Sequence, residues 1–140
     1  MNAPHTHPDG KGDPRPSLLI ADDDHLVRSV LNAQLAGDFQ VIGLAKTVTE
    51  AIELAAEHRP DAALIDVEMP EGGARKAVPQ IVTRSPQTCI VILSGDETRD
   101  LVLELLNAGA MAYLRKGVPG AEISKTLKDA LKAKADPPRP

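Results

Sequence analysis

The sequence predicts an α/β protein in which five parallel strands form a doubly wound sheet, covered by five helices. Short apolar runs alternate with helical stretches along the 140 residues, which is typical of repeated strand–helix units. The central apolar runs lack polar residues at every second position, as in strands that are buried on both faces. Because crossovers between parallel strands are right-handed, we expect the flavodoxin-like strand order 2-1-3-4-5.

The first two units are expected in the first half of the chain. A strand at 18–21 (LLIA) precedes a helix at 25–36, for which Asp24 is the predicted N-cap. A second strand at 39–44 (FQVIGL) precedes a helix at 47–58. Helical stretches of this length can carry the chain back over the sheet, so consecutive strands are expected to run parallel.

The third unit combines a strand at 62–66 (AALID) with a helix at 74–84. Pro79 lies inside this helical stretch, where proline removes an intrahelical hydrogen bond and clashes with the preceding turn. We therefore expect this helix to begin late or to kink.

The last two units complete the sheet. A strand at 88–94 (TCIVILS) precedes a helix at 97–108, and a strand at 111–115 (MAYLR) precedes a helix at 119–134. The segment 101–106 carries five apolar residues that span about 200° of the helix, wider than the stripe of about 100° that docks on a sheet. Part of this apolar surface is therefore expected at the solvent boundary.

One domain over residues 17–134 accounts for these elements. Residues 1–16 are rich in Pro and Gly and are expected to form a disordered tail. Residues 135–140 contain two consecutive prolines, which end the last helix, and are expected to be a disordered C-terminal tail.

Composition excludes several classes of protein. A net charge of -4 argues against broad binding of nucleic acid or anionic lipid. The single cysteine, Cys89, lies in an apolar run and excludes a disulfide framework. No apolar stretch approaches the roughly 20 residues that span a bilayer. We expect a cytoplasmic protein with an aliphatic core, no direct DNA binding and no membrane contact.

Reactive side chains follow four of the five predicted strands. Asp22 and Asp23 follow the first strand, Asp66 ends the third, Ser94 ends the fourth, and Lys116 follows the fifth. In the order 2-1-3-4-5 these four strands are contiguous, so the side chains should meet at the carboxyl edge of the sheet. Open α/β sheets bind their ligands there.

The combination of groups indicates a phosphoryl-transfer site. Three neighbouring carboxylates repel one another unless a cation compensates them, and oxygen ligands favour Mg2+. An ammonium and a hydroxyl suit the oxygens of a transferring phosphoryl group. One of the carboxylates can then act as the nucleophile and hold an acyl phosphate.

Four motifs in this order resemble the receiver domain of response regulators in two-component signalling. They are ADDD at 21–24, DVEMP at 66–70, LSG at 93–95 and YLRKG at 113–117. Several spaced motifs that agree in order are a specific signal. The resemblance covers 17–134 and is closest to the single-domain, chemotaxis-regulator-like architecture.

The resemblance implies a role for each acidic residue. Asp66 would accept the phosphoryl group. Asp22 and Asp23, together with Asp66, would hold Mg2+, and Glu68 would offer the metal its backbone carbonyl.

The resemblance also implies roles for the other site residues. Lys116 would contact the phosphate, Ser94 would be the switch hydroxyl, and Tyr113 the rotating switch aromatic. The sequence departs from the family after Lys116, where Gly117 replaces the usual cis proline, and at Gly73, where an Asp is usual. A cis bond is therefore not expected at 116–117, and Lys116 is expected to be aimed less rigidly.

The implied function is that of a phosphoacceptor, not of an enzyme acting on other molecules. The donor would be a histidine kinase or histidine phosphotransfer protein. Since the chain ends at residue 140, we expect signalling through a protein partner at the face formed by 97–108, 111–115 and 119–134, unless this is part of a longer protein. The main alternative is a degenerate receiver that binds a partner without phosphorylation. An Asp-x-Asp phosphatase using Glu68, and a flavodoxin-like electron carrier, are further alternatives.

Overall fold

The computed structural model of the protein describes residues 12–95 and 99–135. Strands and helices alternate along this part of the chain. The strands are β1 (Ser17–Ala21), β2 (Gln40–Ala45), β3 (Ala62–Asp66), β4 (Cys89–Ser94) and β5 (Ala112–Arg115). The helices are α1 (His25–Leu35), α2 (Val48–His58), α3 (Gly73–Arg84), α4 (Arg99–Ala108) and α5 (Gly120–Ala135).

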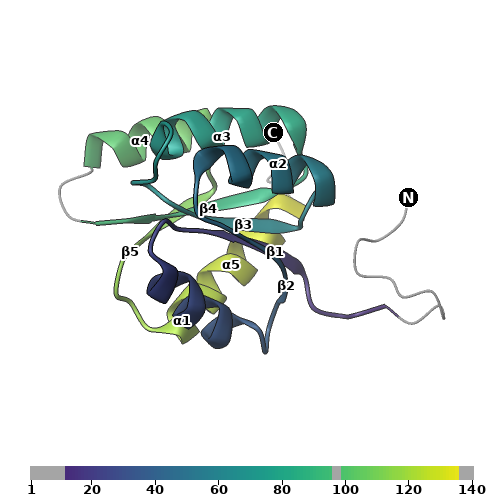
Figure 1. Cartoon of the computed structure of the whole chain (residues 1–140). Coiled ribbons are helices and arrows are strands. Elements are labelled where there is room, and N and C mark those ends of the chain that lie inside the picture. Colours follow the sequence, from purple (N-terminus) through teal and green to yellow (C-terminus); the bar gives the residue numbers. More distant parts are fainter. Residues whose placement is uncertain (1–11, 96–98, 136–140) are drawn as a thin grey trace.

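The five strands form one parallel sheet in the order β2-β1-β3-β4-β5. Figure 1 shows α2, α3 and α4 on one face of the sheet and α1 and α5 on the other. The predicted fold class and strand order are therefore confirmed. This topology brings the carboxyl ends of β1, β3 and β4 side by side.

Alternate residues of the buried strands supply the two halves of the core. Leu19 and Ala21 pack toward α2, α3 and α4, whereas Leu18 and Ile20 pack toward α1 and α5. The core is largely aliphatic, and its one aromatic side chain, Phe39, is fully buried. A strand with helices on both faces needs apolar side chains at every position, which explains the uninterrupted apolar runs in the sequence.

Helix α3 begins at Gly73, so the expected late start caused by Pro79 is wrong. Pro79 lies on the exposed side of the helix, where water can hydrogen-bond the carbonyl that the proline leaves without its helical partner. The hydroxyl of Thr83 donates to the Pro79 carbonyl at 3.0 Å. The helix therefore continues through the proline.

The limits of the two predicted tails stay a prediction, because residues 1–11 and 136–140 lie outside the described part of the chain. Within the segment 1–16, Arg15 forms an ion pair with Asp13 and donates to the carbonyls of Ala36 and Phe39. In the described ranges, no helix is long and apolar enough to cross a membrane.

Candidate functional site

Three carboxylates meet at the carboxyl edge of the sheet. Asp22 follows β1 directly, Asp23 is the next residue, and Asp66 is the last residue of β3. Ligand oxygens of the three all lie within 4.8 Å of one another, and Asp22 and Asp66 are buried whereas Asp23 is exposed. Because β1 and β3 are neighbours in the sheet, these three acids lie close together, as predicted.

Backbone contacts hold Asp22 in place. Its amide donates to the Ala45 carbonyl at the end of β2 at 3.0 Å, and its side chain accepts the Asp24 amide at 2.9 Å. Arg28 donates to the Asp22 carbonyl at 2.7 Å. Asp24 itself accepts the Val27 amide at 3.0 Å, which confirms it as the N-cap of α1.

Asp66 is 1% exposed. Its Oδ1 accepts the Glu68 amide at 3.2 Å, and its Oδ2 lies 3.0 Å from the Nζ of Lys116. Burial raises the pKa of Asp66, and the neighbouring Asp22 carboxylate adds to this effect, while Lys116 and the Glu68 amide oppose it. A buried carboxylate with a raised pKa is typical of a functional position.

Lys116 reaches into the acid cluster from the end of β5. Its Nζ lies 3.6 Å from Asp22 Oδ2, and its backbone amide donates to the Ser94 carbonyl at 2.9 Å. Burial alone lowers the pKa of Lys116, but the contacts with Asp66 and Asp22 raise it overall. The next residue, Gly117, has φ +96°, a conformation that glycine adopts readily and that residues with a Cβ rarely adopt. No cis peptide bond occurs in the described ranges.

The residues present suit a hard divalent cation. Asp22 Oδ2 and Asp66 Oδ2 are buried, and neither accepts a hydrogen bond within the described chain. The Nζ of Lys116 lies 3.0 Å from Asp66 Oδ2, and this contact is an ion pair rather than a well-directed hydrogen bond. Buried carboxylate oxygens need hydrogen-bond donors or a cation as partners. An all-oxygen set of this kind fits Mg2+.

The two predicted switch residues lie on β4 and β5. Ser94 is buried, and its hydroxyl donates to the Gly95 carbonyl at 3.0 Å. Tyr113 pairs with Ile92 across the sheet and is 51% exposed. In this structure the tyrosine ring therefore faces solvent at the edge strand rather than filling the core.

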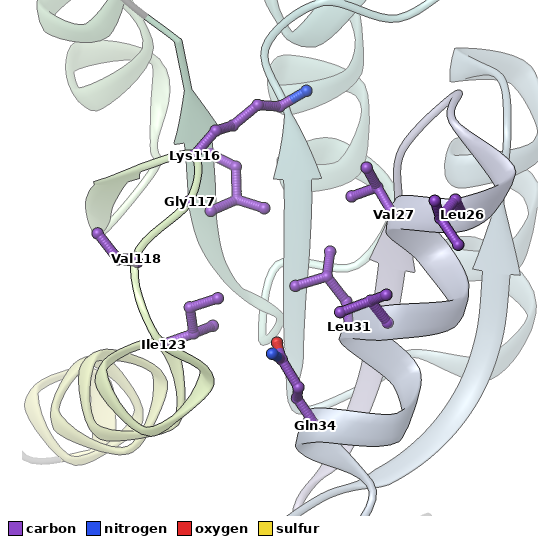
Figure 2. Close-up of a pocket in the computed structure, with 10 residues that line it drawn as sticks. Leu26, Val27, Leu31, Gln34, Lys116, Gly117, Val118 and Ile123 are labelled. Carbon is purple, nitrogen blue, oxygen red and sulfur yellow. The ribbon is translucent and has the colours of Figure 1, made fainter.

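A groove lies beside the acid cluster, between α1 and the loop from β5 to α5. It encloses about 340 Å³ and opens next to Lys116. Figure 2 shows Val27 and Leu31 of α1 on one side of this space, and Ile123 of α5 pointing toward them from the other side. Leu26, one of its lining residues, is 70% exposed.

Two residues near the site were not anticipated from the sequence. Arg28 follows the N-cap Asp24 by four residues, a spacing that indicates a side-chain pair with Asp24, whereas the structure shows it donating to the Asp22 carbonyl. Glu71 contacts Thr49 at the start of α2. No local pattern could have identified Glu71, because its partner is 22 residues away in the sequence.

Residues 18–128 match the sequence model of the response regulator receiver domain. Among curated relatives, the protein-glutamate methylesterase/protein-glutamine glutaminase of Haloarcula marismortui is 39% identical over 119 residues, which cover 81% of this chain and 31% of that protein. The transcriptional regulatory protein PdtaR of Mycobacterium tuberculosis is 39% identical over 100 residues, which cover 71% of this chain and 48% of that protein. The chain thus spans a third to a half of the length of these relatives.

Solved structures of similar size agree in fold. The response regulator domain of Thermotoga maritima CheB superposes with a TM-score of 0.78 at 26% identity, covering 84% of this chain and 97% of that one. A response regulator receiver domain protein from Clostridium thermocellum superposes with a TM-score of 0.80 at 24% identity, covering 86% of this chain and 97% of that one. The second likeness shows the fold alone.

Proposed function

The chain belongs to the response regulator receiver domain family of two-component signalling, and from this membership we propose that Asp66 accepts a phosphoryl group from a phosphohistidine. The observation that carries the proposal is the buried Asp66 carboxylate, which lies 3.0 Å from the Lys116 ammonium and within 4.8 Å of the Asp22 and Asp23 carboxylates. The proposed nucleophile, the carboxylates that would bind Mg2+ and the Lys116 ammonium that would bind the phosphoryl oxygens thus lie close together, as phosphoryl transfer requires.

The proposed reaction is a simple displacement at phosphorus. An oxygen of Asp66 forms a bond to phosphorus while the bond between phosphorus and the histidine nitrogen breaks, and the imidazole keeps the electron pair. Lys116 neutralises charge on the transferred oxygens and draws the carboxylate into position. Mg2+, held by Asp22, Asp23, Asp66 and the Glu68 carbonyl, would neutralise the remaining charge on the phosphoryl oxygens.

The phosphoryl group is proposed to act through Ser94 and Tyr113. Ser94 ends β4 and now donates to a neighbouring carbonyl, and a phosphoryl oxygen on Asp66 would be a stronger, charged acceptor for this hydroxyl. Reorientation of the hydroxyl changes the space available to the half-exposed Tyr113 ring on the adjacent strand. We propose that this change alters the binding of a protein partner at the face formed by α4, β5 and α5.

The donor is proposed to dock on the groove between α1 and the β5–α5 loop. Its histidine must come within bonding distance of Asp66, so the donor has to cover the surface next to Lys116, where this groove opens. The lining is mostly aliphatic, and Leu26 stands 70% exposed at its margin. Such a surface fits an amphipathic helix of a histidine kinase or histidine phosphotransfer protein.

Incubation with acetyl phosphate and Mg2+, followed by intact-mass measurement, tests the phosphoacceptor. We expect the wild type and the Asp129→Asn variant, which alters an exposed acid on α5, to gain the mass of one phosphoryl group. The Asp66→Asn variant should gain none. The same adduct in Asp66→Asn would exclude Asp66 as the acceptor. Absence of an adduct in the wild type would instead favour a receiver that binds its partner without phosphorylation.

A further inference from the structure

Three consecutive residues with positive φ lie where the β3–α3 loop meets the start of α3. The values are 74° for Glu71, 116° for Gly72 and 65° for Gly73. Glycine adopts this region without steric cost, but a residue with a Cβ does so only when surrounding contacts compensate. Glu71 therefore needs a structural reason for its conformation.

The contacts of this loop supply that reason. A carboxylate oxygen of Glu71 accepts the backbone amide of Thr49 at 3.2 Å, and the Pro70 carbonyl accepts the amide of Val48 at 3.3 Å. These are the first two amides of α2. The first amides of any helix lack partners inside the helix, so the loop completes the N-terminus of a helix that precedes it by more than 20 residues.

The remaining α2 amides show that this cap is shared between local and distant groups. The amide of Glu50 donates to the Thr47 hydroxyl at 3.1 Å, and the amide of Ala51 donates to the Thr47 carbonyl at 3.0 Å. The Ala51 bond is the first regular bond of the helix, so among the three preceding amides the Thr47 hydroxyl accepts that of Glu50 and the β3–α3 loop accepts those of Val48 and Thr49.

Charge reinforces the contact between Glu71 and α2. A carboxylate is stabilised at a helix N-terminus by the partial positive charge there. Hydrogen bonds from Thr49 lower the pKa of Glu71, and Lys76 adds to this effect. The side chain is therefore ionised at neutral pH and holds the loop through a charge-assisted bond.

The loop is also held at its other side. The Ala74 amide donates to the Val67 carbonyl at 3.0 Å, and a Cβ at Gly73 would lie only 2.9 Å from that carbonyl. Glu68, whose backbone carbonyl is the proposed metal ligand, lies between the two fixed points. Its position depends on both.

The start of α2 is also linked to the cluster of Asp22, Asp23 and Asp66. Ala45, the last residue of β2, accepts the Asp22 amide at 3.0 Å, and α2 begins three residues later. The start of α2 is thus fixed relative to Asp22, and Glu71 fixes the β3–α3 loop relative to the start of α2.

We propose that Glu71 is a positioning residue of the receiver site: by capping α2, it sets the distance of the Glu68 carbonyl from Asp22 and Asp66. It thereby tunes the affinity for Mg2+ and the lifetime of the acyl phosphate. This inference rests on the proposed function. Groups that orient metal ligands without touching the metal commonly change metal affinity by tenfold or more.

Three variants separate the capping role from backbone strain and from charge. Glu71→Gly removes the carboxylate and also relieves the left-handed backbone, so the domain should remain folded. Glu71→Gln keeps an oxygen acceptor for Thr49 but removes the charge. Glu53→Gln makes the same charge change at an exposed position of α2 and is the matched control.

We expect Glu71→Gly to raise the dissociation constant for Mg2+, measured by calorimetry, by about tenfold and to alter the half-life of the phosphorylated form. Hydrogen exchange at the Val48 and Thr49 amides should accelerate in the same variant. Glu71→Gln should fall between Glu71→Gly and the wild type in all three measurements, and Glu53→Gln should equal the wild type.

The outcomes distinguish this inference from the proposed function. If the wild type binds Mg2+ and takes up phosphate while Glu71→Gly does so with unchanged affinity and half-life, the role of Glu71 is wrong and the function stands. Faster amide exchange without a change in Mg2+ affinity would make Glu71 a helix cap only, which also overturns the inference. If the wild type neither binds Mg2+ nor accepts phosphate, both proposals fall.

Discussion

Asp66 combines deep burial with an unfavourable electrostatic position. Its carboxylate is 1% exposed, and Asp22 beside it is fully buried. Burial and the neighbouring negative charge both raise the pKa of Asp66, because each disfavours the ionised form. A side chain that destabilises the fold when ionised is expected at a functional position, where reactivity is kept at the expense of stability.

The Asp66→Asn variant tests this cost through its pH dependence. The folded-state pKa is raised, so the wild type loses stability as the pH rises from the unfolded value of about 4 through the folded value. Asparagine does not titrate. In the absence of Mg2+, the variant should therefore exceed the wild type in free energy of unfolding by about 1 kcal/mol at pH 7, and this difference should shrink toward pH 4. Urea unfolding between pH 4 and pH 8 measures it, and a constant difference would contradict the electrostatic origin.

Two helices present apolar side chains to solvent, in different positions relative to the site. Helix α1 presents Leu26 beside the groove that opens at Lys116. Helix α4 has Val102 and Leu105 buried against the sheet, while Leu103 is 52% exposed. The expectation that part of 101–106 lies at the solvent boundary is confirmed. Exposed apolar area of this kind often marks a contact surface.

The groove predicts a difference between two kinds of phosphodonor. Leu26→Ser should slow phosphorylation by the cognate histidine-containing donor by tenfold or more, because burial of a leucine side chain contributes about 1.5 to 3 kcal/mol. Phosphorylation by acetyl phosphate, which needs no docking surface, should be unchanged. Leu44→Ser, at a 40% exposed leucine on β2, is the control. Equal loss with both donors would indicate damage to the site instead.

The α4 surface predicts a partner contact that does not support the fold. Leu103→Ala should change the free energy of unfolding by about 0.5 kcal/mol or less, whereas Leu105→Ala, at a buried position, should cost about 2 to 5 kcal/mol. NMR shift mapping with a beryllofluoride mimic should show changes that extend from the acid cluster to 101–113. Shifts confined to the acid cluster would refute the proposed output face.

At the scale of the whole molecule, the sheet holds mutually repelling groups at one edge. Both faces of the sheet are covered by helices (Figure 1), so the strand ends cannot move apart without opening the core. The apolar contacts of the two clusters on either side of the sheet thus offset the repulsion between Asp22 and Asp66. A bound cation would remove that repulsion.

Binding of Mg2+ should therefore stabilise the entire domain. At a concentration 100 times the dissociation constant, mass action adds about 2.7 kcal/mol to the free energy of unfolding. Chelation should reverse the gain in Tm. The Asp22→Asn and Asp23→Asn variants should lose most of it, while Asp100→Asn, an exposed acid on α4, should keep it. An equal Mg2+ effect in all variants would exclude the acid cluster as the site.

The sequence alone was enough to predict the order of elements, the strand order and the edge of the sheet at which the three carboxylates meet. Strands covered on both faces must be apolar throughout, and parallel strands joined by right-handed crossovers must end at one edge. The positions of Asp22, Asp66 and Lys116 therefore follow from where each apolar run stops. The N-cap role of Asp24 was also predictable, because its partner Val27 is three residues away.

The features that join distant segments could not be predicted from local sequence patterns. The cap that Glu71 places on α2, the groove between α1 and the β5–α5 loop, and the half-exposed ring of Tyr113 each depend on packing between elements. The sequence predicted a late start or a kink caused by Pro79, but the helix begins at Gly73 and continues through the proline, which lies on the solvent face. Local patterns encode which face of an element is buried, whereas contacts between elements are fixed only when the whole core has formed.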